Sequence, residues 1–418
     1  MAAALDKDSF LCGRGLQEQF EKLLLQPLLS VDPAHLPQQS LAIVVDALDE
    51  CDRNTDIRMF LKLLAQVEAK SALRLRIFVT SRPELPIQLG FRQLDGSLHQ
   101  DVVLEEAQEH TIRRDIRAYF DNEFAKIKEE RLLKRSDGAL PIDWPSEDDL
   151  QTLVDLAIPL FIFASTVCRF VSESKPQKRL RLILEQRYNA GFSHLAKTYL
   201  PILDQLLLEK EGEEPDAMLG EFREVVGPII LAADPLSIAA LASLLDIDEE
   251  DIRDRLEGLH SVLQIPSNLH DPVRLLHLSF RDFLVDPKRK DKGGFWIDEV
   301  QTHKRLADYC LRRLNESATL RSDICCVAQP GTRRTEWSTQ HITMNIPPDV
   351  AYACSYWPLH LVNDEEELYD DGQVHRFLQQ HLLHWLEALS WLGRLSGAIA
   401  YISQLQSLVC VSPRPIYR

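Results

Sequence analysis

Acidic side chains follow an apolar run in the stretch LAIVVDALDECD, residues 41–52. The run is typical of a buried strand, and Asp46 stands at its carboxyl end. An acid at that end of a parallel strand lies in the crevice where phosphates and Mg²⁺ bind. Asp49 and Glu50 follow one turn later, where an acid can orient water for attack on a terminal phosphate. Taken alone, the motif is explained equally well by a buried strand followed by a solvated acidic helix start.

A second candidate strand, LRLRIFVTSRPE (73–84), ends in polar groups of another kind. Thr80, Ser81 and Arg82 follow its apolar part, and a proline then ends it. An arginine at the edge of a strand beside the first can contact a γ-phosphate. Helical periodicity at 57–69 separates the two strands, and the order strand, helix, strand predicts a parallel sheet.

The next part of the chain changes from short strands to helices. Residues 100–105 are a third, short strand candidate. Apolar residues at every fourth position from Ile112 to Phe124 predict a helix with one buried face. Ser146, followed directly by acids, is a predicted helix N-cap, because its hydroxyl accepts from free amides and the acids suit the positive helix end.

The second half of the chain begins after an acidic linker at 209–216. Three helical patterns are followed by two short strand-like pieces, 261–265 and 273–279, which together have the plan of a winged helix. From about residue 298 the pattern is helical to the end. We assign its large aromatic residues to core packing between helices: Trp357, Trp385 and Trp391.

Composition excludes several classes of partner. The 64 Asp+Glu exceed the 47 Lys+Arg, and the formal charge of −17 repels nucleic-acid phosphates and anionic lipid. The acidic stretch 246–257 would be repelled from a DNA groove. The longest apolar run, 156–171, contains Arg169 and is shorter than the roughly 20 residues that a membrane crossing needs. We therefore expect no nucleic-acid partner and no membrane insertion.

Cysteine and histidine spacing gives no sign of a disulfide framework or a metal site. The eight cysteines have no C-x-x-C spacing and no apolar signal segment precedes them, which indicates a reduced, cytoplasmic protein. His381 and His384 are interpreted as helix surface, because no third ligand stands at a suitable spacing. The basic run 287–292 is interpreted as a solvated loop rather than a nuclear import signal.

Together, LAIVVDALDECD and IFVTSRPE resemble the Walker B and sensor-one elements of the NACHT-type STAND nucleoside triphosphatases, an NLR-like family. The resemblance is closest to the fungal, nephrocystin-like branch. Further stretches are similar to that branch in the same order: EQFEKLLLQPL before the first strand, WPSEDDLQTLVDLAIPLFIFASTVCRFV in the helical lid, LHLSFRDFL in the winged helix, and YACSYWPLHL and HLLHWLEALSWLGRL in the helical part that follows. The likeness covers most of the chain.

The resemblance implies a role for each matching residue of the two strand motifs. Asp46 would coordinate Mg²⁺, and Asp49 and Glu50 would be the catalytic or water-orienting acids. Arg82 would sense the terminal phosphate of bound ATP or GTP.

Two residues later in the chain would complete the nucleotide site. The resemblance implies that His277 contacts the β-phosphate of ADP, and that Pro159 lines the adenine, although the glycine usual beside it is Ile158 here. Without the motif, a histidine on a short strand between Leu276 and Leu278 is more simply a hydrogen-bonded core residue.

The fold implied is α/β and then mostly α, with a truncated parallel sheet of the P-loop type. The expected divisions are an incomplete NACHT nucleotide-binding core at 1–135, a helical lid at 136–208, a winged helix at 216–297 and a C-terminal helical domain at 298–418.

The chain departs from the family at the phosphate cradle. It contains no Gly-x-x-x-x-Gly-Lys-Ser/Thr, and residues 1–15 offer glycines without the lysine and hydroxyl. Backbone amides and that lysine supply most of the binding to the β- and γ-phosphates, and without them the acids repel a triphosphate. We expect an incomplete sheet with an exposed or helix-covered edge. The chain is then a truncated or degenerate member of the family, or a gene model without its first exon.

Two functions follow from these patterns. The first is an interaction or scaffold protein that retains the NACHT architecture without hydrolysis and associates with itself or with protein partners. The second is part of a molecular switch that closes on ADP, through contacts of Arg82 and His277 that differ between two states, and oligomerises on exchange.

Overall fold

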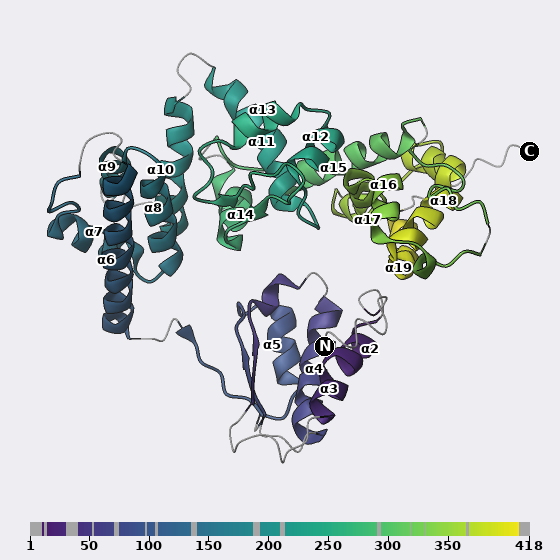
Figure 1. Cartoon of the computed structure of the whole chain (residues 1–418), viewed down its shortest axis with the longest axis horizontal. Coiled ribbons are helices and arrows are strands. Elements are labelled where there is room, and N and C mark those ends of the chain that lie inside the picture. Colours follow the sequence, from purple (N-terminus) through teal and green to yellow (C-terminus); the bar gives the residue numbers. More distant parts are fainter. Residues whose placement is uncertain are drawn as a thin grey trace, which may run out of the picture. The chain divides into compact units, whose positions relative to one another are not determined.

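The structure is a computed structural model, and most of its backbone is helical (Figure 1). It describes residues 11, 15–30, 41–51, 54–70, 75–96, 98–104, 108–134, 140–186, 193–209, 214–290, 294–317, 319–329, 331–364 and 368–408. The chain divides into two compact units. The first comprises 1–102 with 327–342 and 390–396, and the second comprises 103–326 with 343–389 and 397–418.

The first unit contains a parallel sheet and short helices. In chain order its elements are α2 (Leu16–Phe20), the π-helix η2 (Glu21–Leu25), α3 (Gln26–Leu29), β1 (Leu41–Val45), the 3₁₀-helix η4 (Leu48–Glu50), α4 (Asn54–Lys70), β2 (Leu75–Val79) and α5 (Leu85–Arg92). The helix widens into η2 just before Pro27. Proline lacks an N–H and its ring collides with the carbonyl four residues earlier, which a wider turn relieves.

Strands β1 and β2 pair in parallel, with Leu41 opposite Leu75 and Val45 opposite Val79. Helix α4 connects them, so the predicted order strand, helix, strand is confirmed. Alternate strand residues face the helices, where they join a core cluster whose buried members are Phe20, Leu64, Val67 and Leu75. Each such buried side chain stabilises the fold by roughly 1.5–3 kcal/mol. Because side chains alternate along a strand, the rows on the other face are turned away from this core.

The other face of the sheet is open. Val44 is 66% exposed and Phe78 is 60% exposed. A parallel sheet usually has both faces covered, so this exposure is uncommon. The predicted third strand at 100–105 is wrong for residues 100–104, which form no strand, while Glu105 lies outside the described residues. A strand persists only where its backbone N–H and C=O groups find a neighbouring strand, and none pairs with this segment in the described part of the chain.

The first part of the second unit is a group of helices. They are α6 (Glu109–Lys134), α7 (Glu147–Ala157), α8 (Phe161–Glu173), α9 (Pro176–Glu185) and α10 (His194–Glu209). Helix α6 buries Ile116, Phe120 and Phe124, as predicted from their spacing. Ser146 is the N-cap of α7, as predicted: its hydroxyl accepts from the Asp149 N–H, and the Asp149 carboxylate accepts from the Ser146 N–H.

Three helices and a short antiparallel ribbon follow. They are α11 (Pro215–Leu231), α12 (Ile238–Leu245), α13 (Glu249–Leu256), β3 (Leu263–Gln264), β4 (Arg274–Leu275), α14 (Leu278–Val285) and the 3₁₀-helix η7 (Pro287–Arg289). Strand β3 pairs with β4 over two residues only. The prediction that His277 lies on a strand is therefore wrong, since β4 ends at Leu275 and His277 is the N-cap of α14.

The basic run 287–292 is less solvated than predicted. Arg289 is buried, its guanidinium lies 3.5 Å from the centroid of the Phe283 ring, and it donates to the Phe283 carbonyl at 3.0 Å. A planar guanidinium stacks on an aromatic face with little loss of hydration, which explains how a charged residue enters the core here. Residues 291 and 292 lie outside the described part of the chain.

The last helices form a second apolar core. The elements are α15 (Glu299–Asn315), the 3₁₀-helix η8 (Arg334–Glu336), α16 (Thr339–Asn345), α17 (Pro348–Asn363), α18 (Gln373–Leu392) and α19 (Leu395–Leu408). Trp357 and Trp385 are fully buried with ring centroids 5.3 Å apart, and Trp391 is also buried, as predicted. In the parts of the chain that the structure describes, no helix is long and apolar enough to span a bilayer.

Candidate functional site

The carboxyl ends of β1 and β2 bring the predicted strand residues together. Thr80 continues the pairing beyond the strands: its N–H donates to the Val45 carbonyl, and its own carbonyl accepts from the Leu48 N–H, both at 2.9 Å. The Thr80 hydroxyl donates to Asp46 Oδ1 and accepts from the Ala47 N–H at 2.9 Å. One threonine side chain thus holds the Asp46 carboxylate and the turn after it in place.

The turn between Asp46 and η4 requires an uncommon backbone conformation. Ala47 has φ 51° and ψ 54°, in the left-handed region that residues with a Cβ rarely adopt. This conformation costs on the order of 1 kcal/mol for alanine. The hydrogen bonds from Thr80 offset that cost and turn the chain so that Leu48 enters the core while Asp46 stays at the surface.

Asp49 is occupied by contacts to the segment after β2. Its Oδ1 accepts from the Arg82 N–H at 3.1 Å and from the Ser81 hydroxyl at 3.3 Å. Its Oδ2 lies 3.5 Å from Arg82 Nε, and the Asp49 side chain is only 7% exposed. These contacts connect the two strand ends and orient the arginine. Asp49 therefore serves as a brace for Arg82 in this structure.

Asp46 and Glu50 are the acids that face solvent at this edge. Mg²⁺ takes oxygen ligands in octahedral geometry and usually keeps several waters, with one or two carboxylates. Asp46 offers Oδ2 beside the Thr80 hydroxyl, and Glu50 follows one turn later, so the donor chemistry fits the ion. Among the described residues, however, no three His, Cys, Asp or Glu side chains converge on a metal position. The ion would then depend on phosphate oxygens for much of its coordination.

His277 and Pro159 belong to the second unit, whereas Asp46, Asp49, Glu50 and Arg82 belong to the first. Pro159 follows a cis peptide bond in the turn between α7 and α8, and it is exposed. His277 is exposed at the start of α14. Its Nδ1 accepts from the Ser279 N–H at 3.1 Å, which leaves the ring proton of the neutral imidazole on Nε2.

A buried hydroxyl pair supports this imidazole. The Ser279 hydroxyl lies 2.7 Å from His277 Nδ1, and the Tyr199 hydroxyl lies 2.7 Å from Ser279 Oγ. Since Nδ1 is the acceptor, the Ser279 hydroxyl must donate to it and the Tyr199 hydroxyl must donate to Ser279. Tyr199 belongs to α10 and packs against the rings of Phe280 and Phe283. The chain of donors therefore joins α10 to the first turn of α14.

Sequence reasoning did not find the supporting residues. Thr80 was visible as a hydroxyl at the strand edge, but its contact to Asp46 spans 34 positions. Tyr199 had no local signal, because its partner Ser279 lies 80 positions away. Only the folded backbone brings such pairs together.

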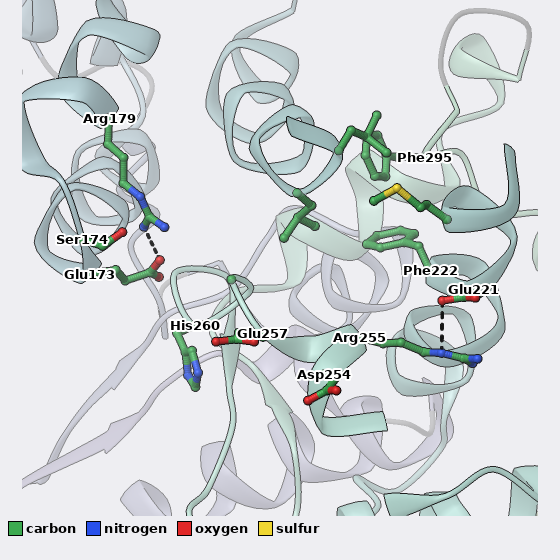
Figure 2. A pocket seen from close by; sticks show the side chains of 14 residues that line it. Glu173, Ser174, Arg179, Glu221, Phe222, Asp254, Arg255, Glu257, His260 and Phe295 are labelled. Carbon is green, nitrogen blue, oxygen red and sulfur yellow. Dashed lines mark hydrogen bonds and ion pairs between the residues drawn. The ribbon is translucent and has the colours of Figure 1, made fainter. Parts of the chain in front are cut away.

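A pocket of about 440 Å³ lies elsewhere in the second unit, between α8–α10 on one side and α11 and α13 on the other (Figure 2). Its apolar lining includes Met218, Phe222 and Phe295. The rings of Phe222 and Phe295 meet edge to face with centroids 5.1 Å apart. Two ion pairs also line it, Arg179 with Glu173 and Arg255 with Glu221. None of the residues predicted from the sequence motifs lines this pocket.

Comparison with known proteins agrees with the resemblance seen in the motifs. Residues 2–82 match the family model described as Nephrocystin 3, N-terminal. The chain is 27% identical over 390 residues to the vegetative incompatibility protein HET-E-1 of Podospora anserina. That alignment covers 88% of this chain and 26% of the relative, so the chain spans about a quarter of its length. No solved structure matches. The two similarities support a relationship with the NLR-like, nephrocystin-related proteins of fungi.

Proposed function

We propose that the chain is a NACHT/STAND-like signalling or scaffold protein whose 418 residues by themselves do not hydrolyse nucleotide. The observation that carries the proposal is the cluster at the carboxyl ends of β1 and β2, where Thr80 orients Asp46 and Asp49 orients Arg82. An ordered acid and an ordered arginine at the edge of a parallel sheet are suited to a metal ion and a phosphate.

The similarity to the vegetative incompatibility protein supports the signalling half of the proposal. Association with itself or with protein partners is the role we infer for the helical surfaces. The formal charge of −17 argues against a nucleic-acid partner, because a surface of that sign repels phosphate.

The inferred lack of hydrolysis depends on the phosphate cradle and on Asp49. No stretch of the chain has the glycine-rich loop with lysine and hydroxyl that usually binds the β- and γ-phosphates. Asp49 is nearly buried and braces Arg82, so it is not available to orient a water molecule. Glu50 remains as the exposed acid for that task.

The test is nucleotide affinity of the purified 418-residue protein, measured by calorimetry with ATP and ADP in the presence of Mg²⁺. We expect no saturable binding at micromolar concentration, because the remaining groups supply too few phosphate contacts. Micromolar binding that Asp46→Ala abolishes and Glu18→Ala does not would overturn the proposal. Glu18 lies on α2 in the same unit, where its carboxylate is 2.8 Å from Lys22 Nζ, and it serves as the matched control.

That overturning result would favour a second function, an ADP-closed switch in which Arg82 and His277 contact different nucleotide states. The hydrogen-bond chain from Tyr199 through Ser279 to His277 supports it, because it presents Nε2–H of a neutral imidazole as a donor suited to a phosphate oxygen. In that case ADP should bind more tightly than ATP to the wild type, and His277→Ala should remove the difference.

A further inference from the structure

We propose that the pocket between α10 and α13 binds a small amphipathic cation, with an apolar ring or branched body and one ammonium or guanidinium group. This site is separate from the nucleotide site proposed above. Its volume of about 440 Å³ is within the range of small-molecule pockets, and apolar and polar side chains both line it.

The apolar part of the pocket is deep. Met218, Phe222 and Phe295 line it, and each is at most 9% exposed, so their surfaces form the floor. Leu206 and Leu207 of α10 complete the apolar wall. Contact with such a floor favours a ligand body that gains by leaving water. An aromatic ring can also meet the two phenylalanine rings, whose edge-to-face contact is the geometry that aromatic pairs prefer.

Both arginines of the pocket are already paired. Arg179 is buried, forms an ion pair with Glu173, and donates to the Phe170 carbonyl at 2.8 Å. Arg255 lies 2.8 Å from a Glu224 carboxylate oxygen and 3.5 Å from one of Glu221. An anionic ligand would have to break one of these pairs to gain a cationic partner, which makes phosphate and carboxylate ligands poor candidates.

The remaining charge of the pocket is negative. Asp254 and Glu257 line it, both are exposed, and in the described part of the chain neither belongs to an ion pair. In the view of Figure 2 they lie between the two arginine pairs. They also stand at the carboxyl end of α13, which ends at Leu256 with Glu257 as its C-cap. The end of a helix carries partial negative charge from its last carbonyls, and this adds to the attraction for a cation.

The backbone beside these acids keeps the pocket wall close to α10. Gly258 has φ 83°, and a Cβ there would approach the Leu206 side chain to 2.7 Å. A glycine therefore lets the loop after α13 pack directly on α10. The wall that carries Asp254 and Glu257 is held against the apolar floor by this contact.

Met218 makes binding directly observable. The chain contains four methionines, and Met59 and Met344 are exposed outside the pocket. We would label the methionine methyl groups of the full protein with ¹³C and titrate it with tryptamine, using indole-3-propionate as the matched anionic probe. Tryptamine should shift the Met218 signal with a Kd on the order of 1 mM, while the signals of Met59 and Met344 stay in place.

The cation preference is tested by charge. Tryptamine should bind roughly fivefold more tightly than indole-3-propionate, since exposed charges contribute modestly in water. The double variant Asp254→Asn with Glu257→Gln should lose this preference. The control Glu250→Gln with Asp251→Asn removes the same charge from exposed positions on α13 outside the pocket, and it should keep it.

Three results would overturn the proposal. The first is a Met218 signal that neither probe moves. The second is equal affinity for the two probes, which would make the site apolar only. The third is a double variant that retains the wild-type preference. A filling variant, Ser174→Trp, should abolish the tryptamine shift, and continued shifting in a folded Ser174→Trp protein would also contradict the site.

Discussion

At the scale of single residues, the acids after β1 differ in what their oxygens contact. Asp46 accepts from Thr80 and remains exposed, whereas Asp49 is nearly buried and accepts from three groups of the segment after β2. The interpretation of Asp49 and Glu50 as equivalent catalytic acids therefore becomes a hypothesis about Glu50, with Asp49 as the residue that positions Arg82.

This difference predicts unequal effects on stability. Asp49→Asn keeps an acceptor for the Arg82 N–H but removes the charge beside the guanidinium, so we expect a loss of about 1 kcal/mol in the free energy of unfolding. Glu50→Gln at an exposed position should change it by less than about 0.5 kcal/mol. Urea unfolding of the two variants measures both. Equal effects would contradict the positioning role of Asp49.

At the scale of elements, the contact between α15 and α17 contains a buried polar chain. His303 Nδ1 lies 2.8 Å from His360 Nδ1, and His360 Nε2 lies 2.7 Å from the Tyr352 hydroxyl. That hydroxyl also accepts from the Ala233 N–H at 3.2 Å. These contacts can all be satisfied with both imidazoles neutral. A further proton would place two N–H groups face to face, so the network opposes protonation.

The network predicts that stability falls as the pH is lowered. Burial lowers the pKa of His303 to about 4 and that of His360 to about 3, from 6.5 in the unfolded chain. Because the folded pKa values lie below the unfolded value, the unfolded state binds more protons between these values. The stabilisation is complete above about pH 6.5 and is lost as the pH falls towards 4 and 3. Each histidine should account for about 1–2 kcal/mol between pH 7 and pH 5.

The measurement is the free energy of unfolding in urea across that pH interval. His360→Gln should reduce the slope against pH, because the substituted side chain takes up no proton. His381→Gln is the control, since His381 lies on α18, is only partly buried and is outside this network. An unchanged slope in His360→Gln would show that the pair does not couple folding to protonation.

The elements themselves were predictable where the signal is local. Alternating and fourth-residue apolar patterns located β1, α4, β2 and α6, and hydroxyl residues before acids or apolar runs located the starts of α7 and α12. His277 was misplaced because the ribbon is only two residues long on each strand and because an imidazole rather than a hydroxyl caps α14. The contacts of Asp49 with Arg82 and of Arg289 with Phe283 depend on the fold and left no pattern in the sequence.

At the scale of the whole molecule, an apolar sheet face coexists with a strong negative charge. Val44 and Phe78 are exposed on the same face of adjacent strands, while the formal charge of −17 opposes contact between copies. High salt screens that repulsion. We expect the protein to self-associate as salt is raised, and Phe78→Ser to reduce this association. Light scattering at matched concentrations would detect it, with Leu383→Ser, another exposed apolar site, as the control. Association that both variants reduce equally would exclude the sheet face as its origin.

The left-handed conformation of Ala47 has a consequence for how this chain can diverge. Glycine adopts that conformation without cost, and asparagine and aspartate adopt it more readily than other residues with a Cβ. Mutational drift at this position is therefore channelled towards a few small or polar residues, and a β-branched residue is disfavoured whatever its hydrophobicity. Two of the accepted substitutions, asparagine and aspartate, would place a new oxygen next to Asp46. The backbone of this one turn thus determines which new ligand groups evolution can introduce at the strand edge.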